Sequence, residues 1–327
     1  MTSGGGAFSP EGPPLPWLLA GAALAACVPL VVTSGPALNF LVTTLIVALA
    51  AQGWNILGGY AGGFSFGHAA FFGTGAYLAA LLPARHGLDP WAAFALAVTG
   101  GAALAAVVGA AAFRAGLRGS YFALVTLAVA EVLRVLANAS AYTGGAAGVL
   151  VPLDPRLAAL QFPGPAAAYL FVLALVVAAM LLTRALARSR LGARMVAVRE
   201  DEDAARALGV DAYATKLAAI ALSGAVTAAA GACYARVFLY VDAGIAYGVR
   251  YSVEALVSSI VGGAGTVLGP VFGAFLLHGL GEAAKAALGG VPGVDLALFG
   301  VLLVLAVRFP PRDLLARLGR RRASGAP

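Results

Sequence analysis

Long stretches of apolar residues alternate along the whole chain with short polar segments or segments rich in glycine and proline. A helix needs about 20 apolar residues to cross a bilayer, and a soluble domain has no core large enough to bury so many runs of that length. Because the third, eighth and tenth runs are short, the pattern predicts eight to ten transmembrane helices in an all-α polytopic membrane protein. The ten candidate spans are residues 17–33, 37–57, 68–83, 90–112, 120–140, 166–186, 214–234, 251–262, 266–288 and 294–309.

The composition supports a membrane protein and argues against several other classes. The chain is 61% hydrophobic and its mean hydropathy is +0.92, whereas a soluble domain is roughly 45–50% apolar. Cys27 and Cys233 both lie inside apolar runs, so we expect neither a disulfide nor a metal site. The three histidines are scattered and no paired carboxylates point to one site, so we expect no catalytic residues and no cofactor.

The distribution of lysine and arginine predicts the orientation in the membrane. If the charged segment 184–216 is cytoplasmic, alternation of the spans places 15 of the 21 basic residues on the cytoplasmic side. The net charge of +7 is then a signature of topology and not of nucleic-acid binding. We expect a disordered leader at 1–16, a permease domain at 17–309 and a basic cytoplasmic tail at 310–327. Both termini are expected in the cytoplasm, with an external loop at 141–165.

Charge is concentrated in one internal segment. From Arg184 to Lys216 the sequence holds twelve of the 35 charged residues, and we expect the cytoplasmic loop at 187–212. The acids at 200–203 favour the start of a short helix, Gly209 permits the left-handed conformation that ends it, and Asp211 can cap the next span. The segment is either a solvated loop that follows the positive-inside rule or a docking surface for a cytoplasmic partner. Its five acids favour docking, because acids contribute little to orientation.

Glycines are concentrated in residues 53–77, where they make up eight of 25 residues. Glycine inside a membrane either lets helices approach closely or breaks a helix so that its backbone lines a cavity. The spacing of Gly59, Gly63 and Gly67 fits close packing. The alternative is a broken segment that lines the translocation path, with Gly63, Ser65, Gly67 and His68 beside it. Both interpretations remain open, and His68 fits a hydrogen-bonded structural residue.

Two further features concern the other spans. Glu131 and Arg134 stand three residues apart, one helical turn, and are predicted to neutralise each other, although ionisable groups within a span are candidates for function. The glycines and proline of 261–270 predict a tight cytoplasmic turn between two spans.

Several blocks of the chain resemble one family of transport proteins, the LivM-type permeases of branched-chain amino acid ABC importers. "DAARALG" at 203–209 is similar to the loop motif of ABC-importer permeases, with Asp203 in place of its glutamate. The wider context of this loop, residues 191–231, and four other blocks match the family in order and are distributed over residues 50–280: "GGFSFGHAAFFGTGAY" (62–77), "LRGSYFALVTLAVAEVLR" (117–134), "TGGAAGV" (143–149) and "VGGAGTVLGPVFGA" (261–274).

The resemblance implies a division of labour. It implies pairing with a LivH-type permease subunit in the lipid bilayer of the bacterial cytoplasmic membrane, two cytoplasmic ABC ATPases, and an extracytoplasmic substrate-binding protein. It also implies that residues 200–209 form the helix that couples the permease to the ATPase. The ATPase-coupling residues are then Glu202, Asp203, Ala204, Ala205, Arg206 and Gly209.

The sequence is consistent with a permease that hydrolyses no ATP itself. Neither Lys216 nor Lys285 lies in the glycine-rich motif that cradles nucleotide phosphates. The predicted substrates are branched-chain or other hydrophobic amino acids, and a urea or amide permease of the same family is the alternative. An ion-coupled secondary transporter is disfavoured, because the middles of the spans contain almost no ionisable side chain.

Overall fold

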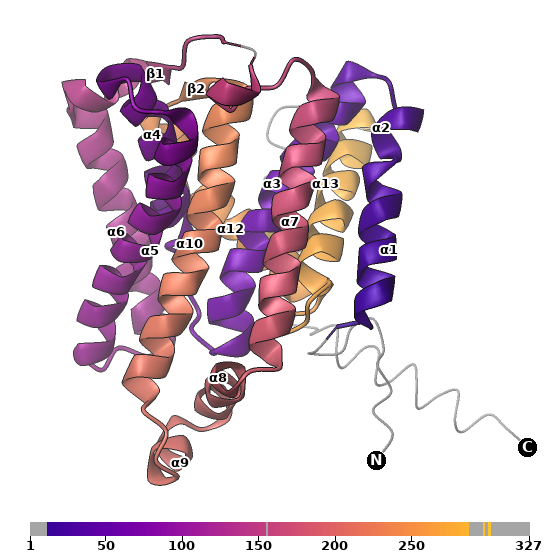
Figure 1. The fold of residues 1–327 in the computed structure, drawn as a ribbon. Helices are drawn as coiled ribbons and strands as arrows, with labels where there is room; N and C mark the ends of the chain where they lie inside the picture. The colour runs from indigo at the N-terminus through magenta and orange to yellow at the C-terminus, as the bar shows by residue number, and fades with distance from the viewer. Residues whose placement is uncertain (1–11, 155, 288–296, 298–299, 302–327) are drawn as a thin grey trace, which may run out of the picture.

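The computed structural model describes residues 12–154, 156–287, 297 and 300–301, and in these residues helices pack side by side into one bundle (Figure 1). The segments rich in glycine and proline separate the helices, as the hydropathy pattern predicts. The helices of the bundle are α1 (Leu15–Ala26) with the single turn α2 (Val28–Val31), α3 (Gly35–Trp54) with its π-helical continuation η1 (Asn55–Tyr60), α4 (His68–His86), α5 (Pro90–Arg114), α6 (Gly119–Ala139), α7 (Pro165–Ala187), α10 (Ala212–Phe238), α12 (Val249–Gly262) and α13 (Gly269–Ala287).

Short elements cover the two ends of the bundle (Figure 1). One end, the hairpin end, carries α8 (Arg190–Glu200) and α9 (Glu202–Ala207). The other, the ribbon end, carries a two-stranded antiparallel sheet in which Val149 pairs with Val241. Its elements are η2 (Ala141–Thr143), η3 (Gly145–Ala147), β1 (Val149–Leu150), η4 (Leu157–Ala159), β2 (Tyr240–Val241) and α11 (Ala243–Ala246).

Five helices of the described part are long and apolar enough to cross a membrane. α4, α12 and α13 coincide with further predicted spans, and α1 with α2 forms a shorter apolar helix where the first span is predicted. The span predicted at 294–309 and the tail at 310–327 lie outside the described residues. The five spans are Gly35–Tyr60, Pro90–Arg114, Gly119–Ala139, Pro165–Ala187 and Ala212–Phe238.

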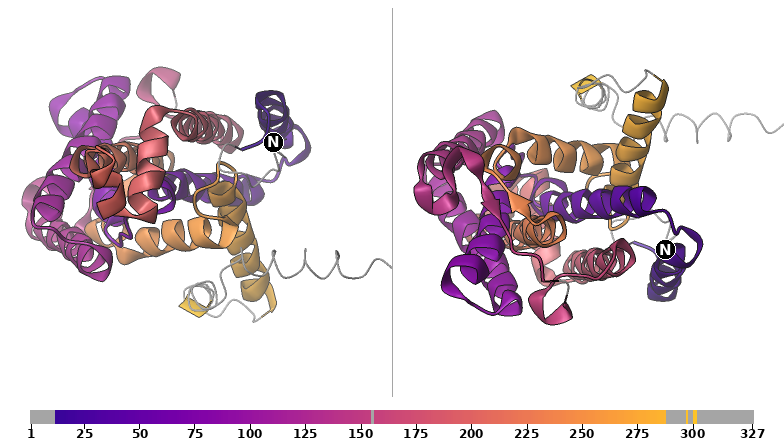
Figure 2. Two further views of the ribbon diagram at one scale, coloured as in Figure 1. Left: turned by 90° about the horizontal axis from the view of Figure 1, so that it is seen from below. Right: turned by 90° about the horizontal axis from the view of Figure 1, so that it is seen from above.

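The centre of the bundle is built on contacts between small residues. A side-chain carbon added to Gly231 of α10 would lie 1.9 Å from the carbonyl oxygen of Phe72 in α4, and one added to Gly75 would lie 2.0 Å from that of Ala228. Only glycine permits backbones to approach so closely, and small residues are the usual means by which helices associate in lipid. The spans that contain α3 and α10 are the most buried of the five, and these two helices occupy the interior. α5 and α6 lie toward one edge and α1 toward the opposite edge (Figures 1 and 2).

The hairpin end contains more structure than the sequence predicts. The segment 187–212, which is expected to be a loop with one short helix, contains α8 as well as α9. The apolar side of α8 is short, because only Gly192, Met195 and Val198 are buried, so hydropathy gives little signal for it. The first helix also begins at Leu15, two residues before the predicted span, and residues 1–11 of the predicted leader lie outside the described residues.

The segment 141–165 closes the ribbon end. It is tied to the segment after α10 by the β1–β2 pairing and by the hydrogen bond from the Val151 amide to the Leu239 carbonyl, which is 2.8 Å long. Within it, the hydrogen bond from Arg156 lowers the pKa of the Asp154 carboxyl below its usual value. The two ends of the bundle differ in their density of charge: α8 and α9 contain seven charged residues, whereas the segment 141–165 contains the single pair Asp154 and Arg156.

Candidate functional site

Local capping interactions define the α8–α9 hairpin, residues 190–211. The side chain of Ser189 accepts a hydrogen bond from the Gly192 amide at the start of α8. The carboxylate of Asp201 accepts from the amides of Asp203 and Ala204, each at 2.9 Å, and so caps α9. Carboxylates at a helix N-terminus satisfy amides that have no partner within the helix.

The connection from α9 to the next span follows the prediction. Gly209 has a φ of +83°, in the left-handed region that favours glycine. The Asp211 carboxylate then accepts a hydrogen bond of 2.9 Å from the Ala214 amide and caps α10. The turn and the cap together set the direction in which α9 leaves the membrane helix.

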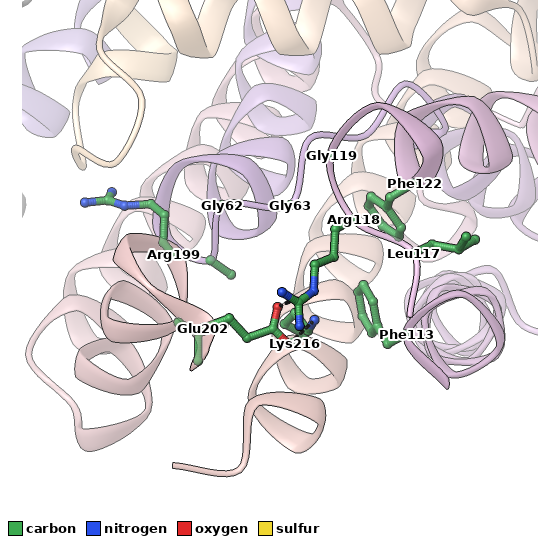
Figure 3. Close-up of a pocket in the computed structure, with 12 residues that line it drawn as sticks. Gly62, Gly63, Phe113, Leu117, Arg118, Gly119, Phe122, Arg199, Glu202 and Lys216 are labelled. Carbon is green, nitrogen blue, oxygen red and sulfur yellow. Dashed lines mark hydrogen bonds and ion pairs between the residues drawn. The ribbon is translucent and has the colours of Figure 1, made fainter. Parts of the chain in front are cut away.

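Glu202 lies at the centre of an ion-pair cluster that joins three segments of the chain (Figure 3). One carboxylate oxygen accepts from Lys216 of α10 at 2.8 Å and from Arg206 of α9 at 2.7 Å. The other lies 3.2 Å from the Nε of Arg118, in the turn before α6. The Glu202 side chain is only 11% exposed, so water screens these contacts less than it screens surface pairs. The cluster therefore fastens the short helix α9 to α10 and to the start of α6.

The two sides of α9 differ in accessibility. Ala205 is buried against Val198 of α8 and Ala212 of α10. By contrast, Asp203, Ala204 and Ala207 are exposed and Leu208 is 86% exposed. Of the residues predicted to contact an ATPase, Glu202 and Ala205 thus face their own chain, because one side of so short a helix has to pack against the bundle. Asp203, Ala204, Arg206 and Gly209 face outward.

The hairpin also contacts the glycine-rich segment directly. Arg199, near the end of α8, donates a hydrogen bond of 2.7 Å to the Gly59 carbonyl. A side-chain carbon added to Gly62, whose φ is +72°, would lie 2.7 Å from Cγ of Arg199. Displacement of the hairpin would therefore push on the backbone at residues 59–62.

The glycine-rich segment is broken between Ala61 and Gly67, where the chain leaves η1 and has not yet entered α4. The indole of Trp54 donates to the Ser65 carbonyl at 2.9 Å, and the Ser65 hydroxyl accepts from the Gly67 amide at 3.1 Å. At the start of α4, the Ala69 amide donates to the Ser252 hydroxyl at 2.7 Å. These bonds satisfy backbone groups that the break in the helix would otherwise leave unpaired.

Side-chain amides of α3 and η1 hold a second interruption, the turn between α12 and α13. Asn55 donates to the Thr266 carbonyl at 2.9 Å and accepts from the Gly265 amide at 2.7 Å, and Gln52 donates to the Val267 carbonyl at 2.7 Å. Residues 263–268 connect α12 to α13, as the turn predicted within 261–270 requires. Hydrogen bonds therefore fix this second interruption against the end of α3 and the start of η1, the helix that leads into the first interruption.

The four residues predicted beside the translocation path comprise two buried polar side chains and two glycines that lie outside the helices. Ser65 and His68 are buried, and the His68 ring bonds to the Ser223 hydroxyl at 2.8 Å. Gly67 packs against the backbone of Thr126 in α6 and lies outside a helix, as does Gly63, so these two glycines do not form a helical small-residue pair. Gly63 borders a cavity of about 110 Å³ that the Glu202 cluster closes on its other side (Figure 3). A role of these four residues in the path remains a prediction.

Sequence reasoning missed the partners that organise this region. In the sequence, Arg118 and Lys216 stand out only as basic residues predicted to lie in the cytoplasm, and Arg199 only as one of many arginines near α9. The single local signal for Leu208 was its apolar character within a charged segment. Pairing between segments that are distant along the chain leaves no local pattern in the sequence, and only the folded chain brings these residues together.

The profile of one protein family, described as "Branched-chain amino acid transport system / permease component", matches residues 37–307. No solved structure matches the chain. The chain is 29% identical over 323 residues to the high-affinity branched-chain amino acid transport system permease protein LivM of Escherichia coli strain K12. That alignment covers 91% of this chain and 74% of the relative.

A second relative, the permease protein BraD of the corresponding high-affinity system of Pseudomonas aeruginosa, is 27% identical over 294 residues, with 85% of this chain and 94% of the relative covered. The family profile covers well over half of the chain and includes four of the five apolar spans completely and all but the first two residues of the other, Gly35–Tyr60. The chain is accordingly a multi-pass protein of the cytoplasmic membrane and belongs to the family of permease components of branched-chain amino acid transport systems.

Proposed function

We propose that this chain is one of two permease subunits of an ATP-driven importer for branched-chain or other hydrophobic amino acids. In this proposal two ATPase subunits act in the cytoplasm, a binding protein delivers the amino acid from outside, and α9 docks against an ATPase. The names of the relatives support the substrate class. The observation that carries the coupling role is the construction of α9, which is fastened on one side and open on the other.

The mechanism follows from the contacts of the hairpin. A force on the exposed tip of α9 would be transmitted through Glu202 to α10 and to the start of α6. Through Arg199 it would also reach the backbone at Gly59, beside the break. Because a six-residue helix has little stability of its own, these attachments make it move with the bundle as one body. Rotation of the docked ATPases would in this way rearrange the membrane helices around the path.

The test replaces the apolar tip of the hairpin. Leu208→Glu is expected to lower the recovery of ATPase subunits with the tagged permease by at least 10-fold and to abolish ATP-driven leucine uptake, because the substitution places a charge in an apolar contact. Leu153→Glu is the matched control, since Leu153 is 75% exposed in the segment at the opposite end of the bundle. Its ATPase recovery should be unchanged. Normal recovery and uptake in Leu208→Glu would exclude α9 as the docking helix.

A further inference from the structure

Of the five apolar spans, α6 is the least covered by the rest of the chain, and its outward face is open. Only 28% of its most apolar window is buried, against 83% for the span formed by α3 and η1. Phe122, Thr126 and Ala130 turn toward the bundle, and the opposite face is open. The side chains exposed on that face are Tyr121, Leu124, Val125, Ala128, Glu131, Val132, Val135 and Leu136.

This open face carries an ion pair. The Arg134 side chain donates to both carboxylate oxygens of Glu131, at 2.8 Å from Nε and 2.5 Å from a terminal nitrogen, as their spacing predicts. The Glu131 side chain is 48% exposed and that of Arg134 is 36% exposed. Glu131 stands eight residues before the end of α6, which is about 12 Å along the helix axis. In the other four spans every charged side chain lies within four residues of an end.

An ion pair at this depth is poorly suited to contact with lipid. Charged groups within a membrane normally face the protein interior or a water-filled cavity, because hydrocarbon solvates them badly. The bidentate geometry holds the two side chains along the helix and prevents them from extending to the membrane surface. The face of α6 that carries them is therefore expected to border water. The side chains around the pair are apolar, with Leu124, Val132 and Val135 on the same face.

We propose that Glu131 and Arg134 form a subsite in the translocation path that binds the charged ends of a zwitterionic α-amino acid. The inference rests on the proposed function and adds the recognition chemistry. The guanidinium of Arg134 would exchange the Glu131 carboxylate for the α-carboxylate of the solute, which has the same planar, two-oxygen geometry. The released Glu131 carboxylate would accept from the α-ammonium group, and Val132 and Val135 would contact the aliphatic side chain.

The exchange explains why a transport path would carry a paired site instead of a single charge. The pair is neutral before the solute arrives, and the combination of pair and zwitterion is also neutral. Each hydrogen bond made to the solute replaces one that exists within the pair, so net binding is weak. Weak binding suits a path, because the solute has to leave the subsite as readily as it enters.

The experiment uses the complete importer in proteoliposomes, with saturating binding protein and leucine. Glu131→Gln with Arg134→Gln together remove both charges and conserve shape. We expect normal insertion and ATPase recovery, with a maximal rate of leucine uptake at least 10-fold lower. Arg134→Lys, which keeps the charge and loses the two-pronged geometry, should fall between this variant and the parent. Uptake by the double variant at the parental rate would overturn the proposal.

A second measurement tests whether the face is wet, independently of uptake. In a background without Cys27 and Cys233, Val132→Cys should react with a membrane-impermeant thiol reagent, and leucine transport should slow the reaction. Val107→Cys is the matched control, because Val107 is a 67% exposed valine on α5, and it should not react. Equal reactivity of the two cysteines would overturn the inference. Labelling of Val132→Cys together with normal uptake by the double variant would also exclude the pair as the binding group.

These outcomes separate the inference from the function on which it rests. If the parent complex itself transports no leucine with ATP, the proposed function fails, and the labelling contrast still reports whether the face borders water. If the parent transports leucine and the variants match it, the subsite alone is excluded.

Discussion

At the scale of single residues, Glu202 is where three segments of the chain meet. Its carboxylate bonds to Lys216 and Arg206 and lies beside Arg118, while its side chain is almost completely covered. Glu202 lies between three positive charges that would otherwise repel one another, and Asp203, 3.6 Å from Arg118, supplies a second negative charge. The cluster therefore needs the negative charge of the Glu202 carboxylate, and an uncharged hydrogen-bond acceptor at this position would not be equivalent.

Glu202→Gln is therefore expected to lower the stability of the purified permease by about 1–3 kcal/mol, the range for losing a charged hydrogen bond at a covered site. Thermal unfolding in detergent measures the change. Glu200→Gln serves as the control, because the Glu200 side chain is 67% exposed and its pair with Arg199 should contribute little. Equal melting temperatures for the two variants would show that the cluster does not hold the hairpin in place.

At the scale of elements, the direction of α9 depends on one backbone conformation. Gly209 is in the left-handed region, and open space surrounds the position that its side chain would occupy. Within this chain a substitution there acts through the backbone and not through packing, and a control residue of similar size accounts for contact with a partner.

Gly209→Val is expected to cost about 1–2 kcal/mol at the turn and to reduce ATP-driven uptake, because an L-residue resists the left-handed conformation. Gly209→Asn is the matched control, since asparagine tolerates this region and should retain most of the uptake. The measurement compares the uptake rates of the two variants at equal amounts of permease in the membrane. If valine transports as well as asparagine does, the orientation of α9 is unimportant for coupling.

At the scale of the whole molecule, the two ends of the bundle are expected to face opposite sides of the membrane. The reason is that 15 of the 21 basic residues lie in segments that successive crossings of the membrane would place on the same side. The structure adds that the hairpin and the β ribbon lie at opposite ends (Figure 1).

Two exposed alanines are suited to labelling after replacement by cysteine: Ala207 in the hairpin and Ala158 in the segment 141–165 at the ribbon end. In intact cells an impermeant reagent should modify Ala158→Cys and leave Ala207→Cys unreacted, and inside-out vesicles should show the reverse pattern. Labelling of both positions from outside would contradict the orientation and the cytoplasmic location of the hairpin.

Most of the bundle could be predicted from the sequence, because a transmembrane helix is a local property. Backbone groups in lipid have to bond within their own segment, so an apolar run of sufficient length specifies a helix regardless of its neighbours. The caps are local for the same reason: Asp211 and Gly209 act on backbone groups a few residues away. The Glu131–Arg134 pair also followed from spacing alone, since residues three apart share a helix face.

Only the tertiary structure decided which side of each element faces the protein. Ala205 turns inward and Leu208 outward on one short helix, because Val198 and Ala212 happen to lie on one side of it. Glu202 is covered by Arg118 and Lys216, and Gly67 packs against Thr126. The residues next to them in the sequence do not indicate these partners. Helical periodicity is a property of the chain itself, whereas burial of a particular side chain depends on segments brought together only by folding.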